Sequence, residues 1–373
     1  MKKNSRYNID EFDDITEEEL WEFRKQRIKK IKKKKKRRRL LLVLEFFVLL
    51  ILSAFAYIMI KYDGMEILDI NSNKVVNANL PKSTLETMKG YTNIAIFGVD
   101  ARNNTSLTKA THSDMIMICS INKSTGDIKL VSVYRDTYSS IDSNDEMHKI
   151  NQAYFRGGPE QALAALNRNL DLNITEYVTV NWKAVADVVN ALGGVDIEIT
   201  DAEFAYINGF ITETVEATGV PSVHLTSSGR QHLDGIQAVA YARLRLMDTD
   251  YRRTERQRKV LELTLQKAKA ADLATLLRLV DIVIPQVSTS LSIRDTADLA
   301  KNITNYNLTE TSGYPFDKES MRVGGQSCVI PQGLIHNNTK LHVLLYENHE
   351  YEYSEKVKEL DTLITYVTGV RKP

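Results

Sequence analysis

The segment from Leu40 to Ile60 contains 21 residues, and Glu45 is its only charged side chain. As an α-helix it would span roughly 31 Å, about the thickness of the hydrocarbon core of a bilayer. The 16 residues before it, Arg24 to Arg39, include 13 Lys or Arg. Basic residues at one end of a hydrophobic helix hold that end in the cytoplasm. We therefore expect a single-pass cell-membrane protein with a cytoplasmic tail at 1–39, a transmembrane helix at 40–60 and an extracellular remainder.

Two other interpretations explain this segment less well. A cleaved signal peptide has a shorter apolar core and a cleavage site of small residues, so an uncleaved anchor is favoured. A nucleic-acid-binding basic patch is the second alternative, but the position beside a spanning helix already explains the charges. Residues 40–373 hold 33 Lys and Arg against 40 Asp and Glu. This mildly acidic balance predicts no nucleic-acid partner, and anionic membrane lipid is a secondary partner of the tail.

The chain has only two cysteines, Cys119 and Cys328. Exported eukaryotic domains of this size usually contain more, as a disulfide framework. Cys119 lies in the apolar run MIMICSI, which is typical of a small buried side chain. We therefore expect a bacterial exported protein that relies on its core, with a Cys119–Cys328 disulfide as the less favoured alternative.

The exported region begins with a polar stretch and continues with alternating strand and helix patterns. Residues 61–90 contain many turn-forming residues and are predicted to be a juxtamembrane stalk, followed by one domain at 91–373. KSTG, between the second and third expected strands, predicts a hairpin. The class is therefore α/β (α+β), with a mixed central sheet flanked by helices. The expected strands are 92–100, 114–122, 127–136, 177–181, 195–199, 240–246, 328–331 and 340–346. The expected helices are 158–170, 182–192, one from about Thr249 into LTLQKAKA, two within 272–310, and 354–368.

The segment YARLRLMDTDYRRTERQR, from Tyr241 to Arg258, is the sharpest chemical feature of this region. If 240–246 is a strand, Arg243 and Arg245 lie on one face and apolar residues lie on the other. Arginine stays charged and forms paired hydrogen bonds, so two parallel guanidinium groups suit a phosphate or pyrophosphate ligand.

Downstream in the same segment, Asp250, Arg253 and Gln257 are spaced to share one face of a helix. The alternative is a solvated basic helix with internal salt bridges, to which Glu255 would contribute. That alternative explains the helix but not two arginines on an apolar strand. An anionic ligand is therefore the favoured hypothesis.

Acidic and basic residues also stand at the ends of the expected strands. Asp100 ends the apolar strand IAIFGVD, Asp114 begins the next strand, and Arg135 closes the third. Ligands of open α/β sheets bind at strand ends and in the loops beside them. Taken singly, each aspartate is also explained as a turn or cap residue. Together, two carboxylates beside arginines suit Mg²⁺, which prefers oxygen ligands and substrate phosphates.

Six ordered segments give the chain a resemblance to the LytR–CpsA–Psr family of bacterial cell-envelope proteins. They cover about residues 92–262, and the basic tail with one membrane helix also fits. One departure is Tyr134, where the family often has Pro; we expect this to alter a turn without removing chemistry. The segments are NIAIFGVDAR, HSDMIMICSINKSTGDIKLVSVYRDTY, KINQAYFRGG, YVTVNWKAVADVVNALGGVDIEI, LDGIQAVAYARLR and DYRRTERQRKV.

The resemblance implies a phosphotransferase of a Gram-positive-type bacterium. Such an enzyme moves an anionic glycopolymer, of teichoic acid or capsule type, from a polyprenyl-pyrophosphate carrier to a peptidoglycan hydroxyl and forms a phosphodiester. The resemblance also implies an apolar lipid-binding pocket between the sheet and its helices. Asp100 and Asp114 match the family's metal positions, for Mg²⁺ or alternatively Mn²⁺, and either is a candidate general base. The matching pyrophosphate-binding positions are Arg135, Arg243, Arg245, Arg253 and Gln257, with Asp250 at a further acidic position.

In this assignment the catalytic set is Asp100, Asp114, Arg135, Arg243 and Arg245. Two further hypotheses use the same site: a polyprenyl-pyrophosphate hydrolase, and a non-catalytic envelope scaffold that binds the lipid. A membrane-bound transcriptional regulator is a third. It is disfavoured because a cytoplasmic tail of 39 mostly polar residues does not accommodate a helix-turn-helix.

Overall fold

A computed structural model describes residues 70–100, 111–245 and 250–372, together with 21, 66–67 and 107–108. The predicted transmembrane helix and nearly all of the predicted tail lie outside these residues. Residues 64–373 form one compact unit. Within the described part of the chain, no helix combines the length and apolar character needed to cross a membrane.

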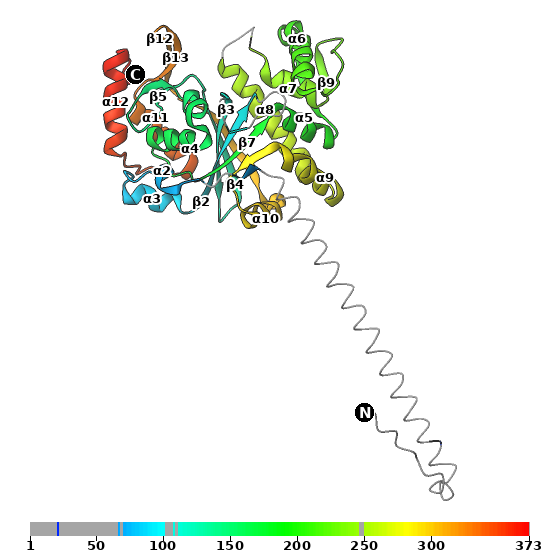
Figure 1. Cartoon of the computed structure of the whole chain (residues 1–373), viewed down its shortest axis with the longest axis horizontal. Helices are drawn as coiled ribbons and strands as arrows, with labels where there is room; N and C mark the ends of the chain where they lie inside the picture. Colours follow the sequence, from blue (N-terminus) through cyan, green and yellow to red (C-terminus); the bar gives the residue numbers. More distant parts are fainter. Residues whose placement is uncertain are drawn as a thin grey trace, which may run out of the picture. The chain divides into compact units, whose positions relative to one another are not determined.

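The centre of this unit is a seven-stranded mixed sheet with the order β1-β10-β7-β2-β3-β4-β11 (Figure 1). β2, β3 and β4 pair antiparallel, whereas β7 pairs parallel with β2 and β11 pairs parallel with β4. The mixed α/β prediction is thus confirmed. The strands are β1 Glu66–Ile67, β2 Tyr91–Val99, β3 Ser113–Asn122, β4 Asp127–Val133, β7 Glu176–Asn181, β10 Val287–Thr289 and β11 Asn307–Tyr314.

The predicted KSTG hairpin joins β3 to β4. The Asn122 side chain accepts hydrogen bonds from the backbone N–H groups of Ser124 and Thr125, at 2.9 and 3.2 Å. Gly126 has a φ of 77°, in the left-handed region that glycine adopts without strain. Because the turn is fixed in this way, Ile121 pairs with Ile128 and the two apolar strands stay in register.

Both faces of the sheet are covered, because side chains alternate between the faces along each strand. Ala95, Phe97 and Val99 of β2 contribute to one core, which also includes Leu163 of helix α4 (Asn151–Leu170). Ile94 and Ile96 contribute to another core on the opposite face. Leu261 of α8 (Asp250–Ala270) and Leu299 of α10 (Ile293–Lys301) pack against that second core.

A separate core lies beside the sheet, in the half that carries α5, α6 and α7 (Figure 1). Gly235 begins α7 directly against α5, and a Cβ there would come within 1.9 Å of the Ala186 carbonyl oxygen. This core is built from α5 Trp182–Ala191, α6 Asp201–Thr218, α7 Gly235–Arg243, and the hairpin of β8 Val195–Ile199 with β9 Gly229–Leu233.

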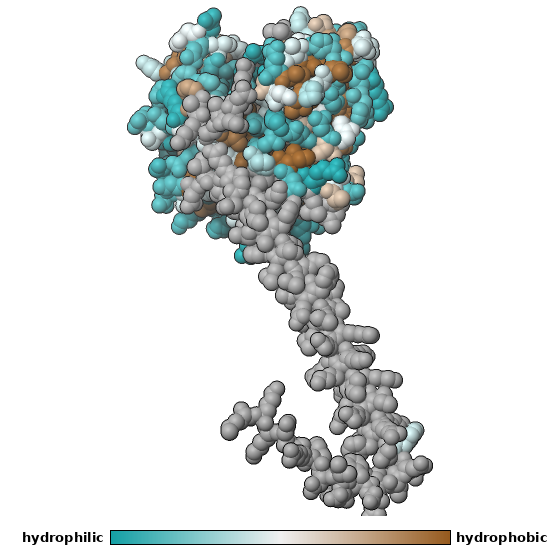
Figure 2. All heavy atoms as spheres, turned by 45° about the vertical axis from the view of Figure 1, so that its right-hand side comes forward, coloured by the Kyte–Doolittle hydropathy of each residue, from teal (hydrophilic) through white to brown (hydrophobic). Residues whose placement is uncertain are grey.

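The face turned forward in Figure 2 is largely hydrophilic, with apolar patches between polar side chains.

Two predicted strands are wrong. Residues 240–243 belong to helix α7 rather than to a strand at 240–246, and 340–346 belong to α11 (Leu334–Tyr346). Every residue from Ala238 to Ala242 is buried, so the run AVAYA lacked the polar positions that separate a helix from a strand. In α11, the alternating LHVLLY conceals Leu341 and Leu345, which are spaced by four and are both fully buried. Helix α6 and strand β10 were not predicted.

Part of the predicted stalk belongs to the folded unit. Residues 70–90 carry α2 (Ser72–Val75) and α3 (Lys82–Met88), in which Val75 and Met88 are buried. Cys119 and Cys328 are buried and are not bonded to each other, so the alternative of a disulfide is wrong. The other predicted helices are observed, including α12 (Glu355–Thr368) and the long α8.

Candidate functional site

Asp100 and Asp114 lie at the same end of two neighbouring strands. Gly98 pairs with Met115 and Val99 pairs with Ser113, so Asp114 is the extra residue of a β-bulge. A bulge bends its strand and redirects a side chain. Asp100 follows Val99 directly, and both aspartates line one cavity. The predicted position at the strand ends is therefore observed, with a bulge as its local cause.

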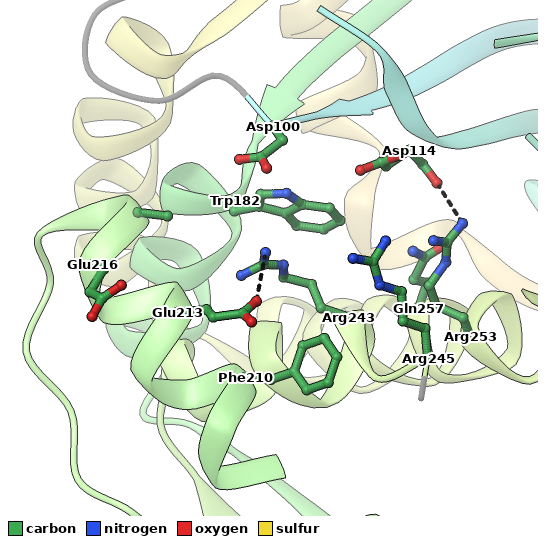
Figure 3. Close-up of a pocket in the computed structure, with 11 residues that line it drawn as sticks. Asp100, Asp114, Trp182, Phe210, Glu213, Glu216, Arg243, Arg245, Arg253 and Gln257 are labelled. Atoms are coloured by element: carbon green, nitrogen blue, oxygen red, sulfur yellow. Dashed lines mark hydrogen bonds and ion pairs between the residues drawn. The ribbon is translucent and has the colours of Figure 1, made fainter. Parts of the chain in front are cut away.

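This cavity has a volume of roughly 590 Å³, and its charged side chains come from β3, α6, α7 and α8 and from the residues that follow β2 and α7 (Figure 3). We call it the arginine cavity. In Figure 3 the two aspartates lie on the sheet side, and the arginines approach from the helices opposite. It is lined by Asp100, Asp114, Trp182, Phe210, Glu213, Glu216, Ala217, Arg243, Arg245, Arg253 and Gln257.

Arg243 and Arg245 reach the arginine cavity from the end of a helix, not from one face of a strand. Arg243 is the last residue of α7, and the buried Leu244 after it is extended (φ −51°, ψ 130°). Two residues spaced by two on a continuing helix would point apart; the extended Leu244 brings Arg245 back to the same cavity. Arg243 Nη1 donates to Thr214 Oγ1 at 2.8 Å, and its Nη2 lies 3.7 Å from Glu213 Oε2. Its charge also stabilises the C-terminus of α7.

Arg253 and Gln257 lie one turn apart on α8, as the predicted spacing requires. Both are only 4% exposed. Arg253 Nη2 donates to the backbone oxygen of Asp114 at 3.3 Å, which ties α8 to the bulge. Gln257 Oε1 is buried and has no hydrogen-bond partner among the described residues. Asp250 is the first residue of α8, and its side chain lies outside the described structure.

Arg135 lines a second cavity instead, of roughly 630 Å³. Arg135 is linked to the arginine cavity through Asp114, because its Nη1 donates to Asp114 Oδ1 at 2.5 Å. We call this second space the polar cavity. Asp100 and Asp114 line both cavities, so the two spaces adjoin at these carboxylates.

Trp182 is a site residue that the sequence reasoning missed. It is the first residue of α5, where Asn181 caps the helix by accepting from the Ala184 N–H at 2.8 Å. Trp182 is 7% exposed, and its indole N–H has no hydrogen-bond partner among the described residues. In Figure 3 the ring lies between Asp100 and Arg243. An aromatic residue on an amphipathic helix is typical of the core, and only the capping Asn181 before it marks a helix start.

The carboxylates fit a magnesium ion that completes its shell from a ligand. Among the described residues, no group of three or more His, Cys, Asp or Glu is arranged to hold a metal. Mg²⁺ is commonly held by one or two carboxylates together with water and substrate phosphate oxygens. Asp100 and Asp114 supply two carboxylates beside a cavity of anion-binding character.

Fold and site together define an α/β protein whose cavity, lined by arginine side chains and a pair of carboxylates, is suited to an anionic ligand. The chain belongs to the LytR_cpsA_psr family, whose model matches residues 56–341. It is 31% identical over 240 residues to the polyisoprenyl-teichoic acid–peptidoglycan teichoic acid transferase TagU of Bacillus mycoides, covering 64% of this chain and 70% of that protein.

Solved structures share the fold. The crystal structure of B. subtilis TagT superposes with a TM-score of 0.55 at 23% identity, covering 74% of this chain and 99% of that one. The LytR-CPS2A-psr family protein YwtF (TagT) with bound octaprenyl pyrophosphate lipid gives a TM-score of 0.53 at 21% identity, with the same coverage.

Proposed function

We propose that this protein transfers an anionic glycopolymer of teichoic acid type from a polyprenyl-pyrophosphate carrier to a peptidoglycan hydroxyl. The observation that carries the proposal is the convergence of Arg243, Arg245 and Arg253 on one cavity with two carboxylates at its edge. Guanidinium groups bind phosphate oxygens through paired hydrogen bonds and do not deprotonate. The name of the TagU relative and the pyrophosphate lipid named with TagT support the same chemistry.

In the proposed reaction, the acceptor hydroxyl oxygen attacks the phosphorus that bears the glycan. A new P–O bond forms, the P–O bond to the polyprenyl phosphate breaks, and polyprenyl phosphate leaves with the bonding electrons. The hydroxyl proton passes to a carboxylate of the Asp100–Asp114 pair. The arginines neutralise charge on the phosphate oxygens, which is the main task in phosphoryl transfer. Asp100 and Asp114 would hold Mg²⁺, which would supply further neutralisation of the pyrophosphate.

We place the polyprenyl chain against the sheet face covered by α8 and α10. The apolar side chains there are less completely buried than those on the opposite face: Ile96, Val178 and Leu261 pack against the core but remain partly exposed. A lipid chain would cover such a surface with a favourable loss of apolar area. We also propose that the protein is anchored by residues 40–60 and acts outside the cell membrane.

The test is transfer by the full chain in liposomes, with a lipid-pyrophosphate-linked glycan as donor and peptidoglycan strands as acceptor. We expect covalent glycan on the strands, abolished by EDTA and by Asp114→Ala, and restored by Mg²⁺ only in the unmodified protein. Arg245→Lys should bind donor about 10- to 150-fold more weakly, because Lys lacks the planar fork that makes charge-assisted bonds. Exposed Arg230, in β9, gives a matched control in Arg230→Lys.

Two outcomes would contradict the proposal. Cleavage of the donor without glycan on the strands would identify a hydrolase. Tight donor binding with no turnover at any Mg²⁺ concentration would identify a lipid-binding scaffold.

A further inference from the structure

We propose that the polar cavity is the subsite for the acceptor saccharide, with His112 and Phe155 as a stacking platform and Asn151 as a hydrogen-bond acceptor. This inference rests on the proposed function and assigns its second substrate, the acceptor, to the polar cavity. The cavity lies next to the arginine cavity and shares Asp100 and Asp114 with it.

The shared carboxylates determine which substrate each cavity receives. In phosphoryl transfer the attacking and leaving oxygens lie roughly in line, on opposite sides of the phosphorus. The arginine cavity holds the pyrophosphate, and therefore the leaving phosphate. The acceptor hydroxyl must approach from the other side of the carboxylate pair, which is where the polar cavity lies.

The lining of the polar cavity suits a neutral, hydroxyl-rich ligand. Four of its five charged groups form ion pairs: Arg135 pairs with Asp114 at 2.5 Å, and Lys149 Nζ lies 3.1 Å from Asp136 Oδ1. His148, also in the lining, accepts from the Lys149 N–H through Nδ1 at 2.8 Å, and its Nε2 lies 3.4 Å from the side-chain nitrogen of Gln326. The cavity therefore offers hydrogen bonds from neutral groups and paired charges, whereas three arginines line its neighbour.

One buried atom in this cavity lacks a partner. Asn151 is 7% exposed, and its Oδ1 makes no hydrogen bond among the described residues. Its backbone N–H donates to the Arg135 carbonyl at 3.2 Å, which holds the residue beside the carboxylate pair. An unpaired buried acceptor costs free energy, and a sugar hydroxyl or acetamido N–H would satisfy it.

An aromatic pair extends the rim of the cavity. The rings of His112 and Phe155 stack with centroids 4.4 Å apart and an interplanar angle of 9°. His112 lines the cavity and is exposed, and Phe155 is 40% exposed. An exposed aromatic ring beside hydrogen-bonding groups matches a saccharide, which has apolar C–H faces and polar edges.

The test measures acceptor and donor separately on the full chain in liposomes. Uncross-linked strands of alternating N-acetylglucosamine and N-acetylmuramic acid serve as acceptor. Phe155→Ala should raise the acceptor KM about 3- to 10-fold, as expected for loss of an aromatic contact. The kcat and donor affinity should not change, and Phe155→Trp should restore the KM. Tyr353→Ala is the matched control, because Tyr353 is 44% exposed and lines neither cavity.

Asn151→Ala gives an independent readout. Removing an unpaired acceptor should leave the melting temperature unchanged or raise it, while the acceptor KM rises. An unchanged acceptor KM in both variants would overturn the proposal, and so would weaker donor binding with an unchanged acceptor KM, which would assign the cavity to the donor glycan. If the unmodified protein transfers nothing, direct binding of the strands decides: binding lost in Phe155→Ala but kept in Tyr353→Ala supports the subsite, and no binding to the unmodified protein refutes it.

Discussion

Asp114 illustrates what the sequence reveals about single residues. A carboxylate at the edge of the apolar run MIMICSI is conspicuous, and so is Asp100 at the end of IAIFGV. Both were predicted at the site for that reason. The bulge that turns Asp114 toward the cavity was not predictable, because it depends on the pairing of β2 with β3. Trp182 was missed since its pattern equally fits a core position.

At the residue scale, we predict that Trp182 donates its indole N–H to the bound pyrophosphate. Trp182→Phe keeps an aromatic ring but removes the donor. Loss of a hydrogen bond to a charged group should weaken donor binding by about 1.5–3 kcal/mol, roughly 10- to 150-fold. The chain has two tryptophans, so Trp21→Phe leaves Trp182 as the only indole fluorophore. Titrating that variant with a polyprenyl pyrophosphate should change its emission. Full affinity in Trp182→Phe would show that the indole serves packing alone.

At the scale of elements, β2, β3, β4 and β7 of the central sheet were predictable, whereas β1, β10, β11 and α7 were not. β3 and β4 are apolar runs joined by a sequence that strongly favours a turn. Their local sequence was therefore enough to predict both strands. In α7, Asp234 and Gln237 form a capping box, a start signal present in the LDGIQ sequence. The strand was predicted from the spacing of the two arginines alone, and the cap was not considered. Arg243 and Arg245 nevertheless line the same cavity, because the helix ends at Arg243.

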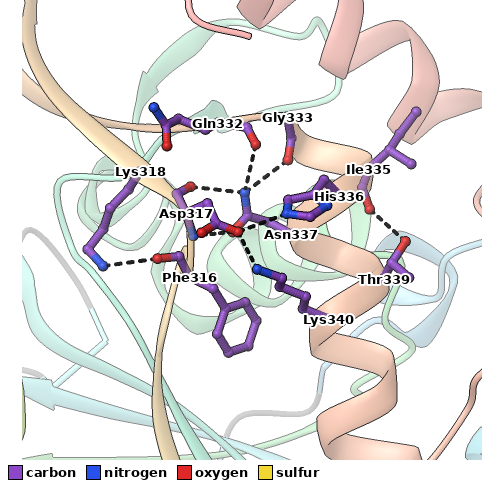
Figure 4. A network of polar contacts seen from close by, with 10 residues as sticks. All are labelled: Phe316, Asp317, Lys318, Gln332, Gly333, Ile335, His336, Asn337, Thr339 and Lys340. Carbon is purple, nitrogen blue, oxygen red and sulfur yellow. Dashed lines mark hydrogen bonds and ion pairs between the residues drawn. The ribbon is translucent and has the colours of Figure 1, made fainter. Parts of the chain in front are cut away.

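Helix α11 shows how a wrongly predicted element is fixed by distant groups. Asn337 is fully buried; its Nδ2 donates to the Asp317 and Gly333 carbonyls, at 3.0 and 2.9 Å. Its Oδ1 accepts from the Asp317 N–H at 3.0 Å, and His336 and Lys340 bind the Asp317 carboxylate (Figure 4). These bonds join the start of α11 to the segment before β12 (Lys318–Val323). No local sequence pattern predicts them.

Helix α11 also carries a pH-dependent contribution to stability. His342 is fully buried, stacks on Tyr351 at 3.9 Å and donates through Nε2 to the Leu170 carbonyl at 3.1 Å. Burial lowers the pKa of His342 to about 4, whereas an unfolded histidine titrates near 6.5. Between these values the unfolded chain takes up the proton and the folded chain does not. The contribution, about 3 kcal/mol, is therefore complete above about pH 6.5 and is lost as the pH falls toward 4.

We predict that His342→Gln melts at a temperature less dependent on pH between 7 and 4.5 than the unmodified protein does. Burial raises the pKa of Asp171, so this carboxyl contributes with the opposite sign. It is present in both proteins, and the comparison between them isolates His342. His349→Gln, at an exposed position, is the control. Parallel melting curves for all three proteins across this range would refute the assignment.

At the scale of the whole molecule, the site lies where the α5–α7 half meets the open ends of β2 and β3. In the other half, α4 and α11 cover one face of the sheet, and α12 packs against α4 and α11 farther from the sheet (Figure 1). The membrane prediction belongs to this scale. We expect the N-terminus in the cytoplasm and the C-terminus outside, because the basic run precedes the apolar segment. Protease added to intact protoplasts should remove a tag placed after Pro373 and spare one placed before Met1. The reverse pattern would invert the topology.

The meeting of two cavities at one carboxylate pair has a consequence for the order of events in catalysis. Under the proposed assignment, donor and acceptor occupy their own spaces and contact the same two aspartates together. The phosphoryl group that bears the glycan then passes directly from the polyprenyl phosphate oxygen to the acceptor oxygen, without a covalent intermediate on the protein. Such a reaction proceeds through a ternary complex, and neither product departs until both substrates have bound. Double-reciprocal plots of initial rate against donor concentration, at several fixed acceptor concentrations, therefore intersect instead of running parallel.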